Sequence, residues 1–167
     1  YSEYHRELPQ FSSEEDELKY LSEKHHYSIT DGNKVGTHQG AHYFTKGQRK
    51  GLHVGGTPEP LFVIDTDVIE NVIYTGQGKT HPGLYRRGLF VKNEEVHWVR
   101  SDLKIGEDEI LEVMARIRYR QNLEKATLHQ TLSGLYVIFE KPQSAITEGQ
   151  FVAWYSNEEL LGSGVIA

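Results

Sequence analysis

Cysteine is absent from this chain of 167 residues, and so are long apolar runs. Without a thiol, the chain cannot form a disulfide scaffold, a thiolate zinc site or an iron–sulfur cluster, and it has no cysteine nucleophile. The mean hydropathy is -0.57, and no apolar run approaches the roughly 18 residues that a membrane-spanning helix needs. We therefore expect a soluble protein. Because it opens on Tyr1 instead of Met, we also expect it to be a piece of something longer.

The motifs of common catalytic and cofactor sites are also missing. Gly78-Lys79-Thr80 resembles the end of a phosphate-binding loop, but position 73, where that loop needs glycine, is Ile. The closest histidine pairs are His25-His26 and His38 with His42, and neither has the glutamate of a helical zinc motif. No Gly-x-Ser-x-Gly nucleophile motif occurs. We expect no catalytic residue, metal or cofactor in this chain, and an independent hydrolase or methyltransferase has no support.

The net charge of -6 is unevenly distributed along the chain. Residues 1–25 hold seven acidic and three basic side chains. In contrast, residues 26–60 have a net charge of +2, and residues 86–120 have a net charge of +1. The local field matters more than net charge for a polyanionic partner, so the two basic stretches are candidates for contact with nucleic acid.

The residue pattern predicts a mainly β fold with one short helix. Ser12 to Leu21 predicts that helix, because serine can cap it and the acidic residues favour the positive end of its dipole. Residues 61–65 and 71–75 predict a hairpin joined by an acidic turn. Six further strands are expected at 89–91, 96–99, 110–120, 126–128, 135–139 and 151–155, and they predict a closed or nearly closed β-barrel.

We expect three parts along the chain. Residues 1–25 form an acidic helical or linker segment, residues 26–84 a small glycine-rich central β domain, and residues 85–167 a six-stranded C-terminal β-barrel. The joint between the last two follows from Gly76-Gln77-Gly78, His81-Pro82-Gly83 and the basic pair Arg86-Arg87.

Two basic motifs are candidates for phosphate contacts. Lys46, Arg49 and Lys50 lie within five residues, flanked by glycines and preceded by Tyr43-Phe44. Cations on a flexible backbone suit phosphate contacts, and exposed aromatics can stack on bases. The alternative is an ordinary solvated basic turn.

The second motif is the run from Glu112 to Arg120. Strand alternation there places Arg116, Arg118 and Arg120 on one face, and Tyr119 on the other face with the apolar residues. Such a row repels itself unless phosphates or carboxylates compensate it. The alternative is pairing with cross-strand glutamates.

Six motifs follow one another in a fixed order. The longest runs from Gly36 to Leu52, GTHQGAHYFTKGQRKGL, and the others are Gly76-Gln77-Gly78 with His81-Pro82, Val96-His97-Trp98-Val99, Arg118-Tyr119-Arg120-Gln121, Ala145-Ile146-Thr147-Glu148-Gly149-Gln150 and Leu161-Gly162-Ser163-Gly164-Val165-Ile166. In this order they resemble the central and C-terminal domains of the tRNA-specific 2-thiouridylases (tRNA-uridine 2-sulfurtransferases). Glu148 stands where that family often has proline, and Ser163 where it often has glycine. Residues 1–29 match only loosely.

The resemblance implies an enzyme that activates the wobble uridine of tRNA with ATP and replaces its 2-oxygen with persulfide sulfur. Members of that family have an N-terminal adenylating domain with a Ser-Gly-Gly-x-Asp-Ser loop for ATP, and they have two catalytic cysteines. Neither this loop nor a cysteine occurs in this chain. We therefore expect the chain alone to be inactive and to hold tRNA. A sulfur-donor protein is expected as a partner of the whole enzyme, membrane and DNA are not, and the location is expected to be cytoplasmic.

The resemblance also assigns residues to tRNA binding. Arg118 and Tyr119 match barrel positions that contact tRNA, and Gln150 matches a third. Arg120 extends this group, and Lys46, Arg49 and Lys50 are further candidates for the tRNA backbone. The competing hypothesis is a structural or protein-interaction β-module with no RNA affinity of its own.

Overall fold

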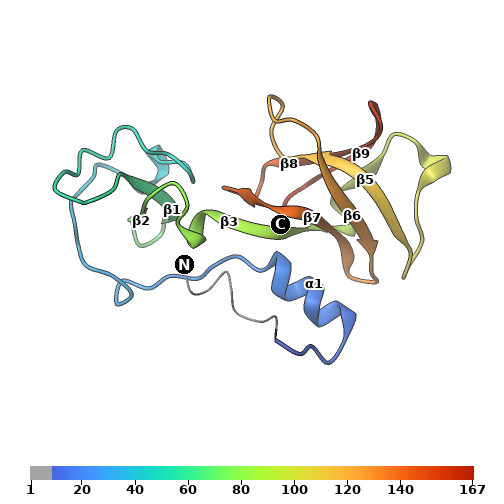
Figure 1. The fold of residues 1–167 in the computed structure, drawn as a ribbon, viewed down its shortest axis with the longest axis horizontal. Coiled ribbons are helices and arrows are strands. Elements are labelled where there is room, and N and C mark those ends of the chain that lie inside the picture. The colour runs from blue at the N-terminus through green and yellow to red at the C-terminus, as the bar shows by residue number, and fades with distance from the viewer. Residues whose placement is uncertain (1–8) are drawn as a thin grey trace. The chain divides into compact units, whose positions relative to one another are not determined.

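The computed structural model describes residues 9–167, which fall into two compact units (Figure 1). One unit comprises residues 24–85, and the other comprises residues 9–23 together with 86–167. Residues 1–8, the start of the predicted acidic segment, lie outside the described residues. The mainly β fold class is confirmed. No described helix is long and apolar enough to cross a membrane.

The predicted short helix is α1 (Glu14–Ser22), and it packs on the barrel unit. Its start is fixed locally, because Ser13 Oγ accepts a hydrogen bond from the backbone N–H of Asp16 at 3.2 Å. Four acidic residues occupy the first turn, where the helix dipole stabilises them. Leu18 is buried in a small apolar cluster with Tyr136 and Ile138 of β7 (Gly134–Ser144).

The central unit is built on the predicted hairpin, which is confirmed. Strands β1 (Leu61–Asp67) and β2 (Val72–Gln77) pair antiparallel. In the turn between them, Asp67 Oδ1 accepts hydrogen bonds from the backbone N–H groups of Ile69 and Glu70. The other regular elements of this unit are two short 3₁₀ helices, η1 (Ala41–Tyr43) and η2 (Pro82–Leu84).

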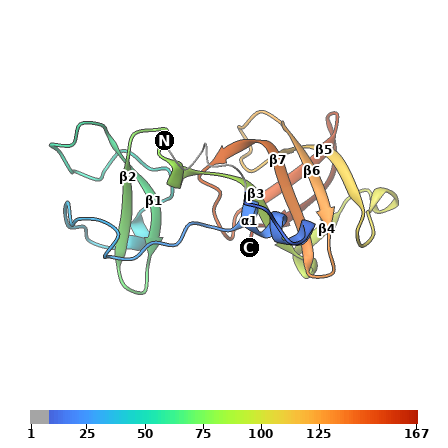
Figure 2. The same ribbon diagram turned by 60° about the horizontal axis from the view of Figure 1, so that its bottom comes forward.

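The second unit contains a curled antiparallel sheet (Figures 1 and 2). Its strands lie in the order β3-β7-β6-β5-β8-β9-β4. Their bounds are β3 (Tyr85–Lys92), β4 (Val96–Trp98), β5 (Ile110–Arg116), β6 (Glu124–Gln130), β7 as given above, β8 (Phe151–Ser156) and β9 (Glu159–Val165), with 3₁₀ turns η3 (Asn93–Glu95) and η4 (Ser101–Leu103) flanking β4. The concave side encloses the main core, in which the largest fully buried side chains are Trp154 and Phe139.

This sheet has seven strands, one more than the six expected, because β9 was not recognised in the sequence. Its Gly162-Ser163-Gly164 run has the composition of a turn. In the structure the glycines allow close packing instead: a Cβ on Gly162 would lie 2.6 Å from the carbonyl oxygen of His97 and 2.7 Å from the Trp154 ring. A Cβ on Gly164 would lie 2.5 Å from Val91. The strand needs small residues at these two positions because the neighbouring backbone and the core side chains pack directly against them.

The close approach at Gly162 predicts a large effect of a single methyl group. We expect Gly162→Ala to lower the free energy of unfolding by about 1–3 kcal/mol, the usual cost of overpacking. Ser163→Ala, on the same strand, should change it by less than about 0.5 kcal/mol. Urea denaturation of both variants measures this difference, and equal stabilities would show that β9 does not pack as described.

Candidate nucleic-acid interface

Strand β5 ends at Arg116, four residues earlier than the sequence pattern predicts. The side chain of Gln121 causes this ending, since its Oε1 accepts the hydrogen bond of the Ile117 N–H at 3.0 Å. The backbone N–H of Gln121 then donates to the carbonyl oxygen of Arg118 at 3.1 Å. Residues 118–121 therefore form a turn instead of extending the strand.

The predicted row of three arginines on one strand face is therefore wrong. Only Arg116 belongs to the strand, and Tyr119 and Arg120 are the two central residues of the turn. Tyr119 does not join the core, since 86% of its surface is exposed. Arg120 is exposed as well. The turn thus presents one aromatic ring and one cation to solvent.

Arg118 connects this turn to a distant segment. Its Nη2 donates hydrogen bonds to the carbonyl oxygens of Ser144 at 2.6 Å and Ala145 at 3.1 Å. Ala145 has a left-handed backbone, with φ of 55°, and its carbonyl oxygen also accepts a hydrogen bond from Thr147. Desolvation lowers the pKa of Arg118 from its usual value, but the guanidinium remains charged. Arg118 therefore acts here as a structural clamp.

A pair of glutamines connects the same two segments. Gln121 Nε2 donates to Oε1 of Gln143 at 2.5 Å, and Gln143 is only 5% exposed. Beyond this contact, the chain turns again before β8, where Gln150 N–H donates to the carbonyl oxygen of Thr147 at 3.3 Å. The side chain of Gln150 is exposed. The structure thus joins the turn at 118–121 to the segment that carries Gln150.

Arg116 forms a second cluster beside the turn, with two tyrosines. Its guanidinium carbon lies 5.2 Å from the ring centroids of both Tyr119 and Tyr155, and its Nη2 donates to the Tyr155 hydroxyl at 3.0 Å. Sequence reasoning missed Tyr155 and its neighbour on the same strand face, Phe151. The alternation of residues 151–155, with Val152 and Trp154 as the core positions, could have identified both.

The three arginines have no acidic partners in the described part of the chain. Across residues 9–167, no salt bridge joins a carboxylate to Arg116, Arg118 or Arg120. Pairing with cross-strand glutamates, the alternative raised by the sequence, is therefore not observed. Arg100 provides the contrast, since it binds both Asp102 and Glu159, which raise its pKa. Among residues 9–167, no carboxylate forms a salt bridge with the guanidinium charges at the turn.

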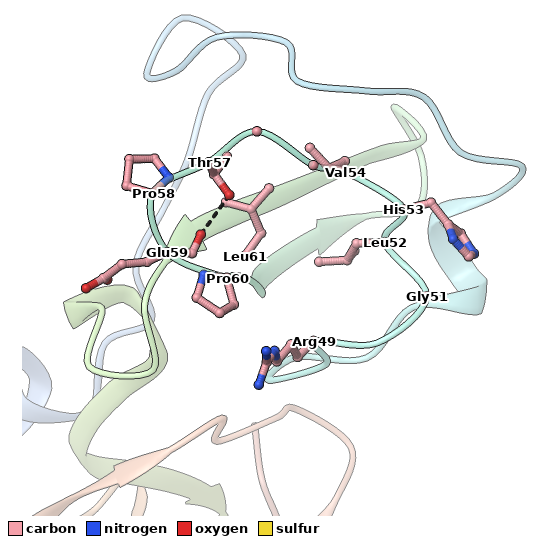
Figure 3. A pocket seen from close by; sticks show the side chains of 12 residues that line it. Arg49, Gly51, Leu52, His53, Val54, Thr57, Pro58, Glu59, Pro60 and Leu61 are labelled. Atoms are coloured by element: carbon pink, nitrogen blue, oxygen red, sulfur yellow. Dashed lines mark hydrogen bonds between the residues drawn. The ribbon is translucent and has the colours of Figure 1, made fainter.

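The other predicted basic residues lie in the central unit, and they differ in accessibility. Lys46 Nζ lies 3.3 Å from Asp65 Oδ1, and the two side chains are only 13% and 15% exposed, so this lysine is engaged in the fold. Arg49 and Lys50 are exposed. Arg49 also lines an open pocket of about 650 Å³ formed by residues 49 and 51–61, in which Leu52 and Leu61 provide apolar surface (Figure 3).

No group of three or more histidine, aspartate or glutamate side chains in residues 9–167 is arranged to hold a metal ion. The side chains that the turn at residues 118–121, Arg116 and Gln150 present are suited to binding. Exposed rings, guanidiniums and an amide are the groups that contact the bases and phosphates of nucleic acids.

Comparison with known proteins identifies both units. A family profile described as "tRNA methyl transferase PRC-barrel domain" matches residues 18–77, and one described as "Aminomethyltransferase beta-barrel domain" matches residues 87–166. The chain is 73% identical over 157 residues to the tRNA-specific 2-thiouridylase MnmA of Christiangramia forsetii, covering 94% of the chain and 40% of that relative. For the protein of the same name in Flavobacterium johnsoniae, identity is 66% over 153 residues, covering 92% and 39%.

A less similar relative likewise matches most of this chain but only part of its own length. The tRNA-specific 2-thiouridylase MnmA of Halalkalibacterium halodurans is 44% identical over 137 residues, covering 81% of the chain and 36% of the relative. The chain thus spans about 40% of the length of the first two of these curated relatives.

The Arg118 clamp predicts a local effect of its removal. Arg118→Ala leaves two carbonyl groups without their charged donor, so we expect amide hydrogen exchange within residues 145–150 to accelerate about tenfold, which corresponds to roughly 1.4 kcal/mol. Arg120→Ala, which changes the same charge without this clamp, should leave the exchange unaltered. Equal exchange in all three proteins would contradict the clamp.

The buried position of Lys46 predicts a structural effect. We expect Lys46→Ala to lower the free energy of unfolding by about 2 kcal/mol, because it removes the ion-pair partner of the largely buried Asp65 carboxylate. Lys50→Ala, at an exposed lysine of the same loop, should change it by less than about 0.5 kcal/mol. Thermal or urea unfolding tests this. A Lys46→Ala protein with the same free energy of unfolding as the wild type would show that the contact with Asp65 does not stabilise the fold.

Proposed function

This chain belongs to the tRNA-specific 2-thiouridylase family, of which it carries the central and C-terminal domains, and we propose that these domains hold tRNA during thiolation of its wobble uridine. The reaction would replace the 2-oxygen of the uridine with sulfur. ATP and the sulfur-donor protein would bind to parts of the whole enzyme outside this chain. With no cysteine to carry a persulfide, the chain by itself would bind and orient the substrate without converting it.

The observation that carries this proposal is the un-neutralised turn at residues 118–121. The turn exposes Tyr119 and Arg120. No carboxylate in the described residues forms a salt bridge with Arg120, or with the guanidiniums of Arg116 and Arg118. A phosphate backbone supplies the missing negative charge and releases counterions when it binds. The relatives' names state that they act on tRNA, which makes RNA the expected polyanion.

The structure favours a different role for each residue of the interface. Arg120 can contact phosphate, because it is exposed and forms no salt bridge with any of residues 9–167. Tyr119 offers a ring face to the RNA, and Gln150 offers an amide that can donate and accept hydrogen bonds. Arg118 contributes charge, but two backbone carbonyls already occupy its Nη2. We therefore propose it mainly as a positioning residue for the segment that carries Gln150.

Arg49 and Lys50 remain proposed contacts with the tRNA backbone, supported by their exposure. Lys46 is a weaker candidate because Asp65 already neutralises it. The cytoplasmic location and the sulfur-donor partner are proposals that rest on family membership alone.

A binding titration with a tRNA that carries a wobble uridine tests the proposed function. We expect the affinity to fall as salt rises from about 50 to about 200 mM, because phosphate contacts release counterions. Arg120→Ala and Tyr119→Ala should each weaken binding about fivefold, which corresponds to roughly 1 kcal/mol. Both residues are exposed, so their unfolding midpoints should stay at the wild-type value.

The matched control is Lys92→Ala, which removes an exposed cation at the end of β3. Its affinity should stay within twofold of the wild-type value. A folded chain that binds no tRNA at low salt, or an equal loss in all variants, would contradict the proposal. The first result would leave the structural β-module as the better account.

A further inference from the structure

The outer face of β8 carries an exposed aromatic ring that the proposed function does not use. Phe151 opens the strand, pairs with Val165 of β9 and is 66% exposed. A single exposed apolar residue needs no explanation. Phe151 is not isolated, however, because the strand geometry brings it to the same face as the Arg116 cluster.

The register of the sheet defines this shared face. Val152 and Trp154 are fully buried, so the alternating residues Phe151, Ala153 and Tyr155 point outward. Arg116 on β5 pairs with Ala153. Its side chain therefore leaves the sheet between the rows of Phe151 and Tyr155, on the side where the guanidinium meets the ring of Tyr119. We call the face formed by Arg116, Tyr119, Phe151 and Tyr155 the aromatic platform.

Arg116 holds the platform in a fixed arrangement. Its guanidinium supports the Tyr119 ring from one side at 5.2 Å and is itself anchored by the hydrogen bond to the Tyr155 hydroxyl. The Tyr119 ring remains 86% exposed, so its other face is open to solvent. A ring that is already ordered loses little rotational freedom when a ligand stacks on it, which favours binding.

The chemistry of the platform selects one kind of ligand. Exposed aromatic faces next to guanidiniums stack on unpaired nucleobases while the cations contact the connecting phosphates. In a continuous RNA duplex, the base faces are covered by neighbouring base pairs and cannot reach such a surface. No salt-bridged carboxylate within residues 9–167 competes for Arg116.

We propose that the aromatic platform binds unpaired nucleotides of the RNA by stacking, with Phe151 and Tyr119 as the stacking rings and Arg116 as their positioning residue. This inference rests on the proposed function and adds a preference to it: the barrel distinguishes unpaired from paired RNA. Arg120 and the other cations bind phosphate in either case, so the two kinds of contact can be separated.

The test compares two RNA probes of equal phosphate number, a hairpin with an unpaired loop and a blunt duplex in which extra base pairs extend the same stem sequence to match the phosphates of the loop. Binding is measured by fluorescence anisotropy for the wild-type chain and for Phe151→Ala. Phe151→Thr is included because threonine keeps the strand propensity of this position. Ile110→Ala is the matched control, since Ile110 is 53% exposed on the same strand as Arg116 but at its far end.

We expect both Phe151 variants to bind the hairpin about five- to tenfold more weakly, in line with the loss of one stacked base, and the duplex within twofold of wild type. Arg116→Lys should likewise weaken hairpin binding, because an ammonium keeps the charge but cannot support the ring and bind the Tyr155 hydroxyl as a planar group does. Ile110→Ala should bind both probes like the wild type.

Four results would overturn the inference. Hairpin binding that is unchanged in both Phe151 variants, or an equal loss on hairpin and duplex, would leave only phosphate contacts; the proposed function would then still stand if Arg120→Ala weakens binding. Self-association of the chain that Phe151→Ala abolishes would assign the platform to a second copy of the protein. A wild-type chain that binds neither probe would defeat the proposed function together with this inference.

Discussion

Two polar contacts between distant segments of the barrel determine where its exposed side chains lie. Arg118 donates to the carbonyl groups of Ser144 and Ala145, and Gln121 binds the buried amide of Gln143. Buried backbone and amide groups are costly when they lack a partner, so both contacts constrain the chain strongly. They set the approach of the chain to β8 and bring Tyr119 and Gln150 into one region of the unit.

The same constraint suits this surface to the binding role proposed above. The barrel offers a stiff scaffold whose core side chains, Trp154 and Phe139 among them, are fully buried. Binding groups placed on turns between such strands keep their geometry when a flexible RNA arrives. The arginines of this region form no salt bridge within residues 9–167, whereas Lys46 in the central unit is paired with Asp65.

Local patterns predicted much of this fold. The serine cap and acidic first turn identified α1, and alternation identified the hairpin and most barrel strands. Two features depend on tertiary contacts and escaped that reasoning. The glycines of β9 are required by the backbone of β4 and by Trp154, and β5 ends at Arg116 because Gln121 captures the Ile117 N–H. The latter contact moved Tyr119 from an expected core position to the surface. The resemblance to known motifs pointed to the turn at residues 118–121, but it gave Arg118 no structural role.

The measurement that tests this account most directly is a map of backbone amide chemical-shift changes in the chain as a wobble-uridine tRNA is added. The account predicts that, in the barrel unit, the largest changes cluster at residues 116–121 and 150–155, while α1 and β3 remain unaffected. Changes centred on α1 and the outer surface of β7, with none at the turn, would contradict it and place the RNA on a different face.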